Sequence, residues 1–301
     1  MTDHARHLDA HYDAPGVDSP GVDSPGEDSP GVQNGPGLLT RLRAAFCDAG
    51  FDPDHLTLDE IAGIDQLHLG GRRASRSLAA QGELAPGSRV LDVGCGTGGA
   101  SRLLAAEFGA EVTGVDITAA FIEVAGWLSR ATGLDDRTRF LCADAAQTPL
   151  ASATFDAVWC QHALMNMPDI AAVLAEWRRL LVPGGTLLLH EVVAGSDTSP
   201  LCLPVPWARR PETSHLRSRQ SLEALLAEGG FAPVAVQDVT ETALAWRRKH
   251  SQREGDGAPS GPALPGPALI FGEVFATMGR NLRDNLAADR VRIIEGVWRS
   301  G

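Results

Sequence analysis

The chain has 301 residues, of which 44% are hydrophobic, so it is long enough to bury the core of one large α/β domain. Its net charge is −12 and no basic stripe is present, which argues against a nucleic-acid substrate, while no apolar run is long enough to span a membrane. Its five cysteines lack metal-binding spacing and no secretory signal begins the chain, so we expect reduced thiols and a cytoplasmic protein.

The first 36 residues form an acidic repeat. They hold seven acidic side chains and one arginine, which is −6 of the net charge of −12. The sequence PGVDS begins at Pro15 and recurs, with changes, at Pro20, Pro25 and Pro30. A segment so rich in Pro, Gly, Asp and Ser cannot bury enough apolar surface to fold. We expect a disordered tail; a calcium-binding repeat is the alternative that the periodic aspartates suggest.

The next segment, residues 37–85, is predicted to be a helical cap. Apolar residues recur at helical spacing in Leu38–Gly50, and a second helix is expected from about Arg73 to Gln81. Pro86-Gly87 then makes a turn into the first strand. The main domain is therefore expected to comprise residues 86–301.

The stretch Val90–Gly98 (VLDVGCGTG) is the most informative part of the chain. Val90–Val93 is predicted to be a buried parallel strand, and the glycines that follow allow a tight turn whose backbone can approach a ligand closely. A helical pattern starts at Gly99, so free N–H groups face this turn. The strand Glu111–Val115 ends in Asp116, where a Rossmann-type fold places the carboxylate that binds ribose hydroxyls.

A dinucleotide site and a turn without a ligand are the two alternative interpretations of this loop. The spacing GxGxG differs from the dinucleotide fingerprint. Asp92, inside the motif, would repel a pyrophosphate but can serve a cationic ligand. The pattern therefore favours a nucleoside ligand with positive charge.

From Thr118 to Val193 strands and helices alternate. A helix is expected over Ala119–Thr132 with Thr118 as its N-cap, and another over Asp169–Leu181. The intervening strands end at Cys142, Cys160 and Val192. This alternation predicts βαβ units and a mostly parallel sheet, whose strand ends meet along one ligand-binding edge.

After Val193 the pattern is less regular. Pro200, Pro204 and Pro206 preclude a helix around Gly195–Arg217, which we expect to cover the acceptor pocket. A helix at about 218–228, a strand at 234–239, a flexible loop at 251–267 and a helix near 269–286 follow. The segment 291–298 alternates partly like a strand, and we expect a closing antiparallel strand rather than continued helix.

Five stretches resemble class I S-adenosylmethionine (SAM) methyltransferases that act on small molecules, of the ubiquinone/menaquinone-biosynthesis and sarcosine/dimethylglycine types. They are DQLHLGG, VLDVGCGTGG, VTGVDIT, QHALMNMPD and LVPGGTLLL, within residues 60–240. The resemblance implies a Rossmann-like, seven-stranded, mostly parallel sheet with helices on both faces. It also implies SAM as cofactor and S-adenosylhomocysteine (SAH) as product. The residues matched to the SAM site are Gln66, His68, Gly70, Gly71, Asp92, Gly94, Cys95, Gly96, Thr97, Gly98, Asp116, Ile117, Asp144, Ala145 and Gln161.

Methyl transfer requires positioning and exclusion of water rather than a covalent nucleophile. A hydroxyl or ammonium acceptor also requires a base, and His162, His190 and Glu191 are the candidates. His68, Met165, Asn166 and Trp207 are expected to contact the acceptor. Asn166 and Asp169 alone do not make a metal site, so we expect no required metal.

The expected function is methyl transfer to an N, O or C centre of a small molecule. The resemblance also implies a role in bacterial secondary metabolism. The alternative is a SAM-fold protein that uses the cofactor structurally, as a cyclase-like catalyst or a non-catalytic partner. We expect no nucleic-acid or membrane partner, and a homodimer is compatible with the sequence.

Overall fold

A computed structural model describes residues 36–255 and 264–301. The acidic tail expected over 1–36 therefore lies almost entirely outside the described residues. So does the central part, 256–263, of the loop expected over 251–267.

The centre of the molecule is a seven-stranded sheet with the order β3-β2-β1-β4-β5-β7-β6. The strands are β1 (Arg89–Val93), β2 (Glu111–Asp116), β3 (Thr138–Cys142), β4 (Phe155–Gln161), β5 (Leu181–Ala194), β6 (Phe231–Asp238) and β7 (Val291–Ser300). Strands β1 to β5 are parallel, and β7 runs antiparallel to both β5 and β6. The prediction of a mostly parallel sheet closed by an antiparallel C-terminal strand is confirmed.

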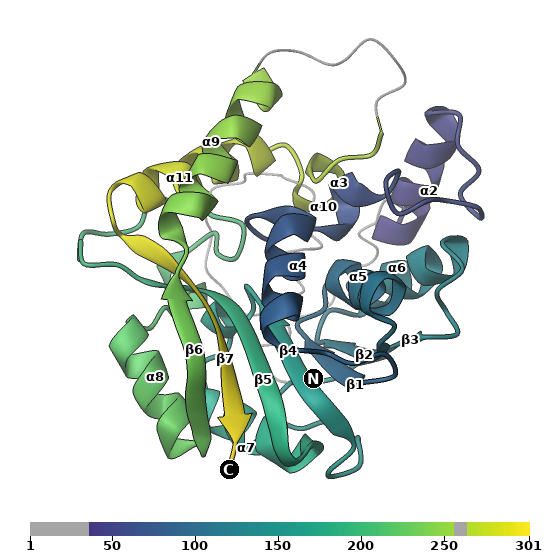
Figure 1. Cartoon of the computed structure of the whole chain (residues 1–301). Coiled ribbons are helices and arrows are strands. Elements are labelled where there is room, and N and C mark those ends of the chain that lie inside the picture. Colours follow the sequence, from purple (N-terminus) through teal and green to yellow (C-terminus); the bar gives the residue numbers. More distant parts are fainter. Residues whose placement is uncertain (1–35, 256–263) are drawn as a thin grey trace, which may run out of the picture.

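The helices occur on both faces of this sheet, as expected (Figure 1). They are α2 (Leu38–Asp48), α3 (Ala62–Asp65), α4 (Gly71–Gln81), α5 (Gly99–Phe108), α6 (Ala119–Ala131), α7 (Ile170–Leu180), α8 (Arg219–Glu228), α9 (Thr240–Gly255), α10 (Ala268–Phe271) and α11 (Phe275–Ala287). Short 3₁₀ turns lie at Leu164–Asn166 and Pro211–Thr213. Thr118 precedes α6, but its side chain makes no capping hydrogen bond, contrary to expectation.

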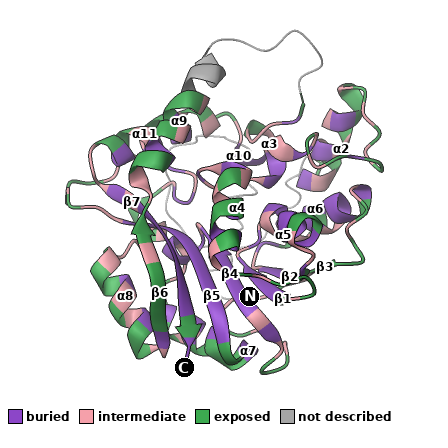
Figure 2. Cartoon of the chain, viewed as in Figure 1, coloured by how far each residue is buried: buried purple, intermediate pink, exposed green. Residues whose placement is uncertain are grey.

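Strand alternation divides the core between the two faces. Leu91 of β1 packs in a cluster with Trp177 of α7 and Leu226 of α8. Its neighbour Val90 packs on the opposite face with Leu78 of α4. Since successive side chains of a strand point to opposite faces, each strand supports helices on both sides. Figure 2 shows the resulting burial of β5 and β7 between their neighbours and the exposed edge strand β6.

Further helices gather beyond the carboxyl ends of the parallel strands, where α2, α3, α9, α10 and α11 lie at one edge of the sheet (Figure 1). Leu42 and Phe46 of α2 pack with Phe121 of α6 and Phe271 of α10. The N-terminal helices are thus joined to the C-terminal part of the chain above the sheet. The boundaries predicted for a separate cap, 37–85, stay a prediction.

Two expectations for the C-terminal third are corrected. Helix α9 was not predicted, and it extends to Gly255, so the segment expected as a loop from residue 251 begins later. The helix expected near 269–286 is instead two helices, because Gly272 adopts a φ of +78° between α10 and α11. Strand β5, expected to end at Val192, runs from Leu181 to Ala194.

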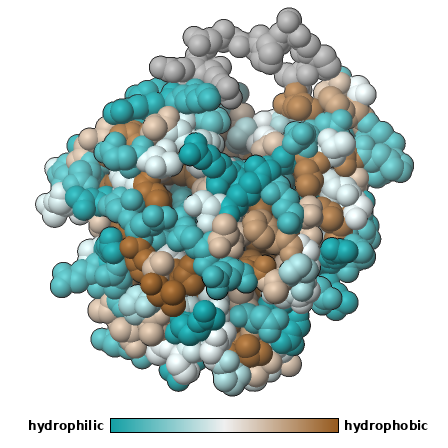
Figure 3. All heavy atoms as spheres, viewed as in Figure 1, coloured by the Kyte–Doolittle hydropathy of each residue, from teal (hydrophilic) through white to brown (hydrophobic). Residues whose placement is uncertain are grey.

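No helix of the described residues is long and apolar enough to cross a membrane. Among these residues only Val234 and Leu264 are large hydrophobic side chains left exposed. On the face shown in Figure 3, hydrophilic side chains predominate and hydrophobic ones form small patches between them.

Candidate active site

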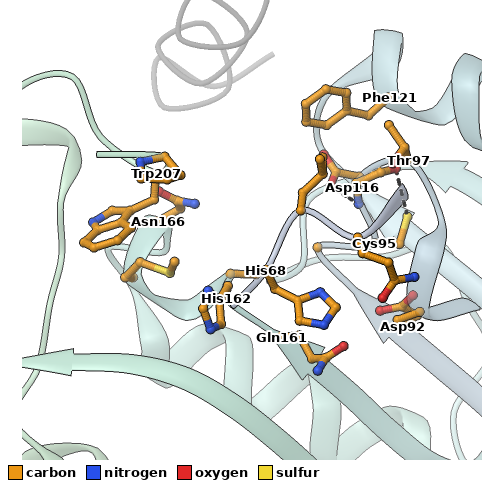
Figure 4. Close-up of a pocket in the computed structure, with 18 of the residues that line it drawn as sticks. His68, Asp92, Cys95, Thr97, Asp116, Phe121, Gln161, His162, Asn166 and Trp207 are labelled. Carbon is orange, nitrogen blue, oxygen red and sulfur yellow. Dashed lines mark hydrogen bonds between the residues drawn. The ribbon is translucent and has the colours of Figure 1, made fainter. Parts of the chain in front are cut away.

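A cavity of about 860 Å³ lies at the carboxyl ends of β1 to β4, beneath the helices at that edge of the sheet. It is lined by most of the residues that the sequence placed in the site. These are Gln66, His68, Gly70, Gly71, Asp92, Gly94, Cys95, Gly96, Thr97, Asp116, Ile117, Asp144, Ala145, Gln161, His162, Met165, Asn166 and Trp207. Gly98, His190 and Glu191 do not line it. Figure 4 shows part of this lining, with His68, Asp116 and Trp207 drawn around the same space.

The glycine loop forms the floor beside β1. Gly94 and Gly96 have φ values of +69° and +53°, which a residue with a side chain rarely adopts. A Cβ on Gly94 would also lie 2.4 Å from the Cβ of Ala163. Gly98, with a φ of +82°, opens α5 and packs against Phe140 rather than facing the cavity. The loop thus presents backbone, and few side chains, to a ligand.

The carboxylate of Asp116 is held in place by the backbone around it. Its Oδ2 accepts a hydrogen bond of 2.9 Å from the N–H of Gly96, and its Oδ1 accepts one of 2.9 Å from Thr118. At the next strand end, Asp144 accepts from the N–H of Ala146 at 2.9 Å. Both carboxylates are therefore oriented before any ligand binds, at adjacent ends of β2 and β3.

Asp92 differs from these two because it is only 2% exposed. Its Oδ2 accepts a hydrogen bond of 2.6 Å from Ser101 of α5, which ties β1 to the helix that follows. Burial raises the pKa of Asp92 to about 6. A cationic ligand nearby would favour its charged form.

The segment around α3 covers the glycine loop from above. Thr97 donates a hydrogen bond of 2.8 Å to the carbonyl of Ile64, and the buried guanidinium of Arg102 lies 3.7 Å from the Asp65 carboxylate. A Cβ on Gly99 would lie 1.7 Å from the carbonyl oxygen of Asp65, so only glycine permits this contact. Both amide atoms of the adjacent Gln66 are buried and find no protein partner in the described residues. They are available to a polar ligand.

Three histidines cluster at the inner end of the cavity. The ring centroids of His68 and His162 are 6.1 Å apart, and the ring of His162 stacks on that of His190 at 5.0 Å. Burial lowers the pKa of His68 to about 4 and that of His190 to about 3, and it holds the pKa of His162 well below 6.5. Burial therefore favours the neutral form of all three rings. His162 has a φ of +52°, a strained conformation for a residue with a side chain.

The placement of His190 and Glu191 corrects the expectation that they face the acceptor. His190 lies behind the ring of His162 and is 2% exposed. Glu191, the next residue of β5, points to the other face of the sheet, where Leu189 and Val193 also pack. Its Oε1 accepts hydrogen bonds from the N–H groups of Ala163 and Leu164 at 3.1 and 3.3 Å. Glu191 therefore braces the turn after β4 and does not reach the cavity.

The opposite side of the cavity is largely apolar. Met165 and Trp207 belong to one buried cluster with Leu282 of α11, and the indole N–H of Trp207 donates to Ser214 at 3.0 Å. Sequence reasoning missed the contribution of the C-terminal helices, which add Trp246, Arg247, His250, Phe271, Phe275 and Leu282 to the lining. The inward face of α9 contains Ala243 and Leu244 together with polar residues. The spacing of apolar residues therefore did not predict this helix.

A metal centre is not evident. Among the residues that the structure describes, no group of three or more His, Cys, Asp or Glu side chains could hold a metal ion. The expectation that no metal is required stays a prediction.

Comparisons with known proteins agree with this architecture. Residues 91–189 match the family model "Methyltransferase domain". Methyltransferase GfsG of Streptomyces halstedii is 32% identical over 205 residues, 66% of this chain and 72% of that protein. The 27-O-demethylrifamycin SV methyltransferase of Amycolatopsis mediterranei is 30% identical over 208 residues, 65% of this chain and 72% of that protein.

Among solved structures, the [4+2]-cyclase SpnF matches with a TM-score of 0.62 and 23% identity, over 88% of this chain and 94% of that one. The geranyl diphosphate C-methyltransferase of Streptomyces coelicolor, in complex with Mg²⁺, geranyl diphosphate and SAH, matches with a TM-score of 0.60 and 18% identity. That match covers 75% of this chain and 79% of that one. Because both structures are less than 25% identical to this chain, these matches establish a shared fold and no more.

Proposed function

The chain belongs to the class I SAM-dependent methyltransferases that act on small molecules, and we propose that its acceptor atom is a hydroxyl oxygen of a molecule of bacterial secondary metabolism. The relatives support this choice, since one is named a methyltransferase of 27-O-demethylrifamycin SV and two fungal relatives are named O-methyltransferases. The observation that carries the proposal is the pair of neutral imidazoles, His68 and His162, in the lining of the cavity.

The residues present suit SAM. When bound, SAM supplies an electrophilic methyl group on a positively charged sulfur. Asp116 would accept hydrogen bonds from the ribose hydroxyls, because its two oxygens are already oriented by Gly96 and Thr118. Asp144 would accept from the adenine amino group. The buried amides of Gln66 and Gln161, which have polar atoms without a protein partner in the described residues, would bind the remaining polar groups.

The acceptor would bind between the histidines and the C-terminal helices. Met165, Trp207, Trp246 and Phe275 line this part of the cavity and favour an apolar acceptor body. The buried Oδ1 of Asn166 has no protein partner in the described residues and would accept a hydrogen bond from a polar group of the acceptor. Because the site is covered by helices, water would be displaced when the acceptor binds.

A hydroxyl acceptor must lose its proton as the new bond forms. Since burial keeps the cavity imidazoles uncharged, a nitrogen lone pair is present across the physiological pH range. A protonated imidazole could not accept that proton and would repel the sulfonium. The low pKa values thus favour a hydrogen-bond acceptor beside the reacting oxygen.

The test is incubation with SAM and matched acceptors that carry either a hydroxyl, its methyl ether or an amine at the same position. Mass spectrometry should show the gain of one CH₂ unit only on the hydroxyl compounds, together with formation of SAH. Methylation of the amines alone would refute the hydroxyl proposal. Conversion of the acceptor without loss of methyl from SAM would instead favour the cyclase-like alternative.

Two further proposals concern the cellular location and the oligomeric state of the protein. We propose a cytoplasmic protein, which is supported by five cysteines that are all free in the described structure. A homodimer is proposed as its assembly. Cell fractionation and light scattering on the purified chain test these two proposals.

A further inference from the structure

Four side chains from β4, α4 and the loop before α4 form one buried hydrogen-bond network that ends at His68. The indole N–H of Trp159 donates to Oε1 of Gln161 at 3.2 Å. The hydroxyl of Ser75 lies 3.0 Å from the same Oε1 and 3.1 Å from Nε2 of His68. Trp159 and Gln161 are two residues apart on β4 and so share the face on which α4, with Ser75, packs.

The indole of Trp159, at one end of this hydrogen-bond network, fixes the direction of the hydrogen bonds that follow. An indole N–H can only donate, so the atom of Gln161 that faces Trp159 must be the amide oxygen. That oxygen accepts from the Ser75 hydroxyl as well. With its single proton directed to Gln161, Ser75 can only accept from His68.

A second contact of His68 agrees with this assignment. Its Nε2 also lies 3.2 Å from the carbonyl oxygen of Gly71, and a carbonyl can only accept. Both neighbours of Nε2 are therefore acceptors, so Nε2 carries the proton. The second ring nitrogen, Nδ1, then carries the lone pair on a ring that lines the cavity.

The hydrogen-bond network keeps one arrangement because the side chains that form it are buried. Ser75 and Trp159 are fully buried and Gln161 is 8% exposed, so water cannot compete for these hydrogen bonds or reverse them. Burial also keeps His68 uncharged, in agreement with the low pKa already described. His162 has no comparable support, since its Nε2 is buried without a protein partner in the described residues.

We propose that Nδ1 of His68 accepts the proton of the acceptor hydroxyl and that Ser75 is the positioning residue that fixes the tautomer of His68. This inference rests on the proposed function, because it requires a hydroxyl acceptor. In the step, the acceptor oxygen forms a bond to the methyl carbon while the carbon–sulfur bond breaks, and its electron pair stays on sulfur. The hydroxyl proton moves to Nδ1, so the positive charge passes from the sulfonium to the imidazolium.

The first test needs no acceptor. Nitrogen-15 NMR of the SAH-bound wild-type protein should show His68 neutral at pH 7, with its proton on Nε2 and Nδ1 unprotonated. A His68→Asn spectrum assigns the signal by its disappearance. A proton on Nδ1, or a charged ring, would overturn the proposal whatever the enzyme methylates.

The second test separates the roles of His68 and Ser75. In His68→Gln, the amide N–H₂ can still donate to Ser75 and Gly71, but no ring lone pair remains at the position of Nδ1. We expect kcat to fall about 100-fold with KM for SAM nearly unchanged. Ser75→Ala should lower kcat by about tenfold and raise the share of His68 that is protonated on Nδ1, because only the 3.2 Å contact with the Gly71 carbonyl then holds the proton on Nε2. A purely structural role of Ser75 would not cause this change.

Ser77→Ala is the matched control, since Ser77 lies on the same helix but donates to Glu295 at 3.1 Å, away from this hydrogen-bond network. It should leave both kcat and the His68 tautomer unchanged. Wild-type kcat in His68→Gln would overturn the proposal even if hydroxyl compounds are methylated. If only amines are methylated, the proposed function fails, and the NMR result still decides the tautomer of His68.

Discussion

Replacing Glu191 with glutamine should stabilise the protein above pH 7 and leave its stability nearly unchanged near pH 4. The carboxylate is fully buried, and its Oε1 accepts hydrogen bonds from the turn that follows β4. The other oxygen, Oε2, has no partner in the described residues. Burial outweighs the favourable N–H groups and raises the pKa of Glu191 to about 7. Glutamine keeps an accepting oxygen for the turn but never ionises.

The magnitude follows from the two pKa values. A carboxyl whose pKa is higher in the folded than in the unfolded state stabilises the fold at low pH, and this contribution is lost as pH rises from the unfolded to the folded value. The window is therefore from 4.5 to about 7. Each pH unit in this window corresponds to about 1.4 kcal/mol. The free energy of unfolding of the wild type should therefore fall by ~3 kcal/mol relative to that of Glu191→Gln between the two ends of the window.

Urea denaturation of both proteins at pH 4, 5, 6, 7 and 8 measures this difference. The free energies of unfolding should nearly agree at pH 4, diverge from pH 5 to about 7 and stay apart at pH 8, while kcat stays near wild type because Glu191 does not line the cavity. A difference that does not change with pH would refute the reasoning. Glu176→Gln is the control of opposite sign. Hydrogen bonds from Arg179 and then Thr148 lower the pKa of Glu176 to about 2, so this variant should lose stability at neutral pH.

Three further predictions concern the cofactor side of the site and the tail. Asp116→Ala should weaken SAH binding by at least about 100-fold in calorimetry, a loss of about 2.7 kcal/mol, without changing the circular dichroism spectrum; unchanged affinity would refute the ribose assignment. Gly99→Ala should cost about 1–3 kcal/mol and weaken SAH binding, because the new Cβ overlaps the Asp65 carbonyl. Gly126→Ala, where an added Cβ meets only the end of an arginine at 3.4 Å, should instead stabilise by about 0.5–1 kcal/mol, and equal Tm shifts in the two variants would contradict the clash. Deleting residues 1–34 should leave kcat and Tm near wild type, and a large loss of either would show that the acidic tail supports the fold.

The fold was predictable because its signals are local. The short apolar runs, the glycine turn after Val93 and the helical pattern from Gly99 need only a few neighbouring residues to be recognised. Helix α9 was not predicted, and the reason is physical. The face of the helix that lines the cavity includes Arg247 and His250, so the sequence shows no apolar face at helical spacing. A helix that lines a ligand cavity need not show the pattern of a helix that covers a core.

The site was predictable in part. Strand ends along the parallel sheet meet at one edge, and this placed Asp116, Asp144 and Gln161 together although they are distant in sequence. His190 and Glu191 show the limit of this reasoning. Adjacent strand residues must face opposite sides, and the sequence does not say which side holds the ligand. The structure turns Glu191 away and covers His190 with His162.

The sheet and its ligand-binding edge were predictable from sequence, because the glycine loop and the carboxylate after the second strand follow from backbone geometry over short spans. The identity of the cofactor came from the resemblance that these motifs carry. Only the tertiary structure decided which imidazole can accept a proton. Ser75 and Gln161 are 86 residues apart, and the direction of their hydrogen bond exists only when α4 packs on β4 with Trp159 at one end and Gly71 at the other. The position of one proton in this protein thus depends on packing between segments that no local pattern connects.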